Sequence, residues 1–146
     1  MKSKLVSEKA GERTFVVILN TGEEAFAAIT EFAGRERLSG ASLTALGAFE
    51  RAVVGWFDPD TRKYRDIPVE QQCELLSAIG DIADGDDGKP SLHLHVVLGL
   101  SDGSAKGGHL LKATVRPTME ITLVESPVHL RRGKHPELGI ALISLP

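Results

Sequence analysis

The segment from residue 91 to 100 alternates more clearly than almost any other part of the sequence. It reads Ser-Leu-His-Leu-His-Val-Val-Leu-Gly-Leu. Successive side chains on a β-strand point to opposite faces. The even positions therefore form a continuous apolar face, while His93 and His95 lie on the other face. A strand with one apolar face has to be buried against a second layer, so this segment predicts a sheet with one covered face and one more polar face.

A single helix is expected near the N-terminus, after a buried strand at residues 13–20. Thr21 is a good N-cap, and Glu24 three residues later completes a capping box. Phe26, Ile29 and their apolar neighbours recur at helical spacing. Gly34 is a plausible end, although polar residues 35–37 could extend the last turn.

The rest of the chain shows a period of two, which is typical of strands. We expect strands at residues 41–48, 50–57, 63–67, 72–82, 91–100, 108–116, 118–125 and 139–145. Short connections such as Asp58-Pro59-Asp60 and the turn at residues 101–104 favour hairpins over crossovers. One early helix followed by many strands predicts an α+β fold with a mostly antiparallel sheet. The 146 residues are expected to form one domain, residues 1–146.

The histidines form a candidate metal site. The Cα atoms of His93 and His95 should lie roughly 6.6 Å apart along the strand. If segments 91–100 and 108–116 form a hairpin, the residue numbers of directly paired positions add up to a constant. An even sum near 204 to 206 places His109 on the histidine face, and an odd sum places it on the leucine face. Because the leucine face is fully apolar, the even register is favoured. Glu120, on the next strand, is a candidate fourth ligand or base.

Three histidines with an open position are the ligand set of catalytic zinc, and they also suit iron or nickel. An alternative is that these histidines only form hydrogen bonds at a surface or subunit interface. Catalysis stays open, since the sequence spacing indicates no Ser/His/Asp or Cys/His arrangement. Cys73 lies in an apolar run and is interpreted as a small core residue.

Composition limits the partners. The formal net charge is −3, whereas a stand-alone DNA-binding protein usually carries a basic surface. A local contact with nucleic acid is still open at the basic run Arg131, Arg132 and Lys134. The N-terminus is too polar for a signal peptide, and no apolar run approaches the length of a membrane span. We therefore expect a cytoplasmic protein without a membrane partner, in keeping with its single cysteine.

Residues 91–111, SLHLHVVLGLSDGSAKGGHLL, resemble the signature of the plant-and-prokaryote conserved (PPC) family, a domain of formerly unknown function. Residues 39–57 resemble its glycine-punctuated pair of strands. Residues 71–77 resemble a short motif of plant members, with Gln71, Gln72 and Cys73 in place of Gly, Arg and Phe. The resemblance spans about residues 12–145. It implies one main helix against an antiparallel sheet, assembled as a homotrimer.

The resemblance also implies a function, because prokaryotic members are often described as DNA-binding by association with plant members. The plant domain is fused to an AT-hook, whose Arg-Gly-Arg-Pro core is absent from this sequence. Two hypotheses follow. One is a trimeric DNA-binding or regulatory module that recruits DNA or a regulatory protein and carries a histidine site for a metal or small ligand. The other is a metal-dependent enzyme or small-molecule-binding protein that uses His93, His95 and His109.

Overall fold

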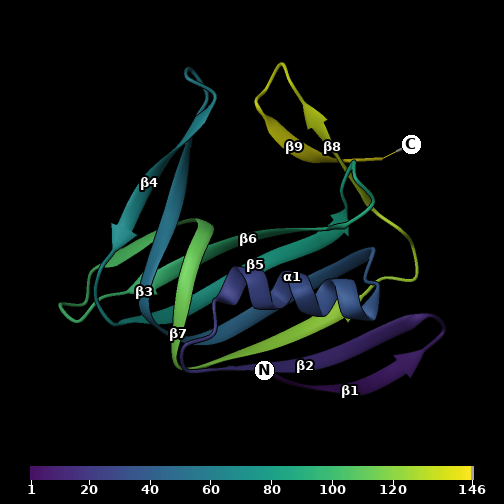
Figure 1. Ribbon diagram of the computed structural model, residues 1–146, viewed down its shortest axis with the longest axis horizontal. Coiled ribbons are helices and arrows are strands. Elements are labelled where there is room, and N and C mark those ends of the chain that lie inside the picture. Colours follow the sequence, from purple (N-terminus) through teal and green to yellow (C-terminus); the bar gives the residue numbers. More distant parts are fainter. Residues whose placement is uncertain (146) are drawn as a thin grey trace.

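The computed structural model describes residues 1–145, and within them it contains one helix and nine strands (Figure 1). The helix α1 spans Ala25–Glu36. The strands are β1 (Lys2–Lys9), β2 (Glu12–Asn20), β3 (Gly40–Asp58), β4 (Lys63–Val69), β5 (Cys73–Asp84), β6 (Pro90–Gly99), β7 (Ala105–Glu125), β8 (Arg131–His135) and β9 (Ile140–Ser144).

These strands form one sheet, which is almost entirely antiparallel. Its main order is β1-β2-β7-β3-β5-β8-β9, while β4 pairs with β3, and β6 pairs with both β5 and β7. The parallel contact between β5 and β8 consists of a single pair, Asp84 with Arg131. The predicted α+β class with a mostly antiparallel sheet is confirmed. Within the described chain, no helix has the length and apolarity needed to cross a bilayer.

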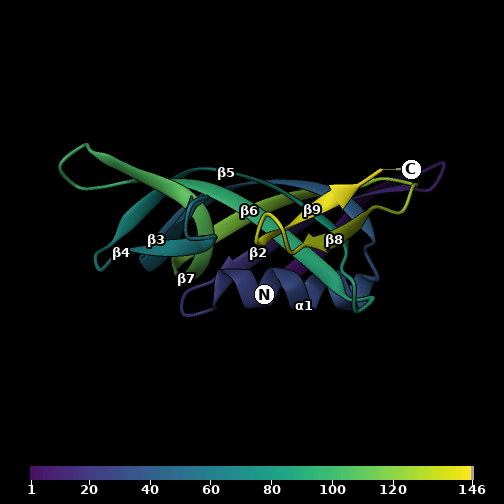
Figure 2. The same cartoon turned by 90° about the horizontal axis from the view of Figure 1, so that it is seen from above.

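The core lies between the helix and one face of the sheet. Figure 2 shows α1 packed beneath that face. Ile29 and Phe32 of the helix are fully buried, and the ring of Phe32 meets that of Phe15 from β2 edge-on at 5.4 Å. Leu94 and Leu98 of β6 are also fully buried. The predicted leucine face of residues 91–100 is therefore a core face, and the histidines lie on the opposite side of the sheet.

The helix begins later than the capping box at Thr21 predicts. Its N-cap is Glu24, whose carboxylate accepts hydrogen bonds from the backbone N–H groups of Phe26 and Ala27. The Thr21 hydroxyl instead donates to the carbonyl of Pro117 on β7. The side chain that the local sequence predicts as the N-cap, Thr21, thus forms a tertiary hydrogen bond instead of capping the helix. The helix also continues two residues past Gly34, as the polar residues allowed, and Arg37 closes it in a left-handed conformation.

Several predicted strands are parts of longer ones. Residues 41–48 and 50–57 both lie in β3, and 108–116 and 118–125 both lie in β7. Register shifts in the β3–β7 pairing, between Gly47 and Phe49 and again nearby, let these long strands bend without ending. Two strands were not predicted. β1 is an exposed edge strand, and β8 contains the basic run Arg131, Arg132 and Lys134.

Candidate metal centre

The hairpin of β6 and β7 brings the three histidines together. His95 pairs directly with His109, which is the even register favoured by the sequence. The approach of β7 depends on Gly107 and Gly108. A Cβ at Gly107 would lie 2.9 Å from the carbonyl oxygen of Val96, and one at Gly108 would lie 2.6 Å from that of Gly55. Residues without side chains are thus needed where β7 passes between β6 and β3.

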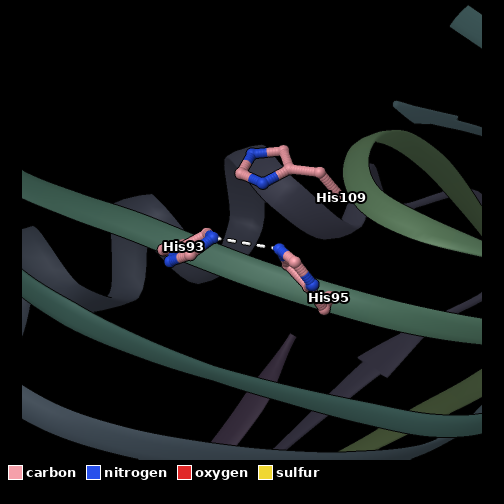
Figure 3. A group of neighbouring side chains, drawn as sticks. All are labelled: His93, His95 and His109. Carbon is pink, nitrogen blue, oxygen red and sulfur yellow. Dashed lines mark hydrogen bonds between the residues drawn. The ribbon is translucent and has the colours of Figure 1, made fainter. Parts of the chain in front are cut away.

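The three imidazole rings face one shared space (Figure 3). One nitrogen from each ring lies within 4.8 Å of the others. The Nε2 atoms of His93 and His95 are 3.1 Å apart, and the ring centroid of His109 lies 5.0 Å from that of His93 and 5.6 Å from that of His95. Three donors from two adjacent strands are therefore arranged as a group that one ion could bind.

The donor set fits a metal ion on a second ground. Among the described residues, the buried Nδ1 of His109 has no hydrogen-bond partner. A buried polar atom without a partner is costly, and a metal ion would satisfy it. Two nitrogens on a tetrahedral zinc ion lie about 3.3 Å apart when each bond is about 2.0 Å long. The observed separation of His93 and His95 is close to that value.

The local electrostatics favour neutral rings, which are the form that binds metal. Burial, followed by the nearby His93, His95 and Arg132, lowers the pKa of His109 from 6.5 to about 4. Burial also lowers the pKa of His93, with smaller contributions from Arg132 and His95. Lone pairs are therefore available on these two rings at neutral pH.

Two neighbours of the cluster were not identified from the sequence. The ring of Tyr64 on β4 lies 5.0 Å from that of His109, and burial raises the pKa of its hydroxyl. Asp81 on β5 pairs with His93, and its carboxylate lies 3.8 Å from that ring. Asp81 lies two residues after Ile79 in the predicted strand 72–82, so the sequence does place both side chains on the same face. This is a weak signal for a site residue, because the local sequence does not show which strand pairs with residues 72–82.

Glu120 lies elsewhere on the same sheet. It is exposed on β7 and is flanked by Leu46 of β3 and Ile18 of β2. The group of potential metal ligands found in residues 1–145 consists of the three histidines and does not include Glu120. A role for Glu120 as fourth ligand would therefore need a rearrangement, and the structure gives no contact that favours it.

The basic run divides into two kinds of side chain. Arg131 and Lys134 are exposed on β8 and remain available to a partner. The side chain of Arg132 is only 5% exposed, and its guanidinium donates to the Asp81 carboxylate and to the backbone carbonyl of Ser91. It is committed to an internal ion pair, so the structure does not offer it to a phosphate group.

Most of the chain matches one known protein family. Residues 6–127, most of the chain, match the model described as the Plants and Prokaryotes Conserved (PCC) domain. The chain belongs to this family. The signature at residues 91–111, which includes all three histidines, lies within the matched region. A comparison with curated protein sequences gave no match.

Solved structures of the family have the same fold. A plant- and prokaryote-conserved protein from Pyrococcus horikoshii is 32% identical with a TM-score of 0.85, and the match covers 92% of each chain. A metal-containing protein from Archaeoglobus fulgidus is 30% identical with a TM-score of 0.82, covering 97% of this chain and 98% of the other. A protein from Ralstonia eutropha, provisionally described as DNA-binding, is 28% identical with a TM-score of 0.83, covering 90% and 91%.

Proposed function

We propose that this family member binds one divalent metal ion through His93, His95 and His109 and keeps an open coordination position for a small ligand. The observation that carries the proposal is the convergence of three imidazole nitrogens within 4.8 Å. Zinc suits three nitrogen donors best, and iron or nickel suits them too. The similarity to the metal-containing protein from Archaeoglobus fulgidus supports the proposal.

The surroundings leave room for a ligand. A shallow groove of about 310 Å³ runs beside His95, and its floor and walls include Ile79, Val97 and the two glycines of β7. A bound ion would supply Lewis-acid chemistry to a carbonyl or water held there. The side chains of this groove are mostly apolar, so they would orient a ligand by packing. The same geometry suits either a small-molecule-binding protein or a metal-dependent enzyme. The two are distinguished by whether the bound ligand is converted to a product.

The metal proposal is tested by elemental analysis of protein purified without an affinity tag. We expect about one ion per chain in the wild type, because three protein ligands form one site. The His93→Ala/His95→Ala variant should lose it. His129→Ala is the matched control, since His129 is an exposed histidine outside the cluster. Metal content far below one per chain in the wild type, unaltered by replacing the cluster, would remove the proposal.

We also propose the homotrimer that the family resemblance implies. The sheet face opposite the helix exposes three large apolar side chains that line one hollow: Leu46, Leu76 and Ile79, at 62%, 54% and 66% exposure. A contiguous apolar face of this kind is typical of an interface. Light scattering should give three times the 15.7 kDa chain mass, and Ile79→Lys should shift the population toward smaller species. A monodisperse monomer in the wild type would rule the trimer out.

A second candidate function is association with DNA, alone or as a regulatory module. It is favoured by the similarity to the protein from Ralstonia eutropha that is provisionally described as DNA-binding, and by Arg131 and Lys134, which are exposed on β8. Fluorescence anisotropy with duplex DNA tests it. Affinity should fall as salt rises and fall further in Arg131→Ala/Lys134→Ala, because phosphate contacts release counterions. Absence of binding at moderate salt, or binding insensitive to salt, would count against it.

A further inference from the structure

His93 presents its two ring nitrogens to different partners. Its Nε2 lies 3.1 Å from Nε2 of His95, inside the cluster. Its Nδ1 lies 3.8 Å from Oδ2 of Asp81, which pairs with it across β5 and β6. Metal-binding histidines almost always donate the N–H of the other nitrogen to a carboxylate, carbonyl or water. Asp81 occupies the place where that acceptor would stand.

Arg132 holds Asp81 in this place. The Arg132 guanidinium is almost completely buried and donates to Oδ1 of Asp81, which leaves Oδ2 on the side of His93. The same guanidinium donates to the carbonyl of Ser91 at 2.7 Å. Ser91 is two residues from His93 on β6, so one side chain ties the carboxylate to the strand that carries the ligands. A buried arginine without these partners would be strongly unfavourable.

We propose that Asp81, held by Arg132, is a positioning residue that accepts the Nδ1–H of His93 and so directs the lone pair of Nε2 toward the metal. This inference rests on the proposed metal binding at the same histidines. The separation of 3.8 Å exceeds a direct hydrogen bond, and a small side-chain rotation closes it. The chemistry is that of a carboxylate–histidine–metal arrangement.

The positioning pair has a consequence for the C-terminal hairpin of β8 and β9. Arg132 lies beyond residues 6–127, the part matched by the family model. Asp81 lies within the matched part, whereas Arg132, which holds its carboxylate, comes from the C-terminal hairpin of β8 and β9. Because energetic coupling is reciprocal, metal binding should stabilise the docked hairpin as much as the docked hairpin strengthens metal binding.

The first test needs no metal. Long-range ¹H–¹⁵N NMR of the metal-free protein reports which nitrogen of His93 carries the proton. We expect the Nδ1–H tautomer in the wild type and its loss in Asp81→Asn. Asp84→Asn is the matched control, because Asp84 lies on the same strand with its carboxylate 4.0 Å from His129. An Nε2–H tautomer in the wild type, or the same tautomer in Asp81→Asn, would overturn the assignment.

The second test measures zinc affinity by competition with a chromophoric chelator. Asp81→Asn should weaken binding by about 10- to 100-fold, the usual effect of losing such an outer partner. Asp84→Asn should leave it unchanged. Because Asp81→Asn leaves a buried arginine without a charged partner, Asp81→Asn/Arg132→Met is a second variant. It should recover thermal stability, since both charges are removed, and still bind zinc weakly.

The two tests separate this inference from the function on which it rests. If the wild type takes up no zinc while His93 is Nδ1–H, the metal proposal fails and the contact with Asp81 stands. If zinc binds equally well to the wild type and to both Asp81 variants, the metal site stands and the positioning role is rejected.

Discussion

Two hairpins of this chain differ in how they are held, although both are antiparallel pairs. The β6–β7 hairpin lies inside the sheet, where β6 also pairs with β5, and β7 pairs with β2 and β3. The β8–β9 hairpin extends the sheet through the single pair Asp84–Arg131, and Figure 1 shows it projecting from the body of the molecule. The first is positioned by continuous pairing. The second depends on a few contacts, with the buried Arg132 as the main side-chain anchor.

The largest expected difference concerns core packing. Leu94→Ala on β6 should lower the free energy of unfolding by about 2–5 kcal/mol, because a fully buried leucine leaves a cavity. Leu142→Ala on β9 should change it by less than about 0.5 kcal/mol, since that side chain is 38% exposed. Urea unfolding of both variants checks the contrast. Equal losses would show that the second hairpin is packed as firmly as the first.

A glycine pair sharpens the comparison. Gly108→Ala on β7 should destabilise the fold by roughly 1–3 kcal/mol, because the new Cβ would lie 2.6 Å from the carbonyl oxygen of Gly55. Gly133→Ala on β8 meets nothing closer than 3.6 Å and should be neutral within about 0.5 kcal/mol. Thermal melts compare the two. If alanine at position 108 left the stability unchanged, β7 would not be packed as closely against β3 as we infer.

The anchor of the second hairpin is tested by two neighbouring arginines. Arg132→Met should cost about 1–3 kcal/mol, because the partly exposed Asp81 loses its hydrogen-bonded partner. Arg131→Met should stay within about 0.5 kcal/mol, as an exposed substitution. Limited proteolysis should cut the β8–β9 segment faster in the first variant than in the second. Equal cutting would show that other contacts hold the hairpin.

The metal-free protein should also show a pH-dependent stability that originates in the β6–β7 hairpin. The pKa of His109 is lowered to about 4 in the folded state, so below pH 6.5 the unfolded chain binds a proton that the folded chain does not. Stability is therefore complete above about pH 6.5 and falls as pH drops toward 4. The loss is at most about 3 kcal/mol, and less because the ring is partly solvated.

His109→Gln should flatten this dependence. Chemical unfolding at pH 7, 6 and 5 measures the slope in each protein. A slope unchanged by His109→Gln would assign the acid sensitivity to other groups.

The local pattern of residues 91–111 was enough to predict much of the candidate site. Alternation is a property of neighbouring residues, so it assigned His93 and His95 to the face opposite the leucines. The fully apolar leucine face then favoured an even register, and His95 does pair with His109. Glu120 shows the limit of such reasoning. It was expected on a separate strand after the one that carries His109, but residues 105–125 form the single strand β7, which carries Glu120 eleven residues along the sheet from His109.

The sequence by itself thus determined the alternation of β6, the main helix, the antiparallel class and the three histidines, because each rests on spacing within a short segment. Only the tertiary structure decided that Glu24 caps the helix, that β1 and β8 are strands, and that Arg132 lies against Asp81. Thr21 is drawn from the cap by Pro117, 96 positions away, and Arg132 and Asp81 are 51 positions apart. Neither partner's own neighbours favour such a pairing, so it is set by how the strands assemble.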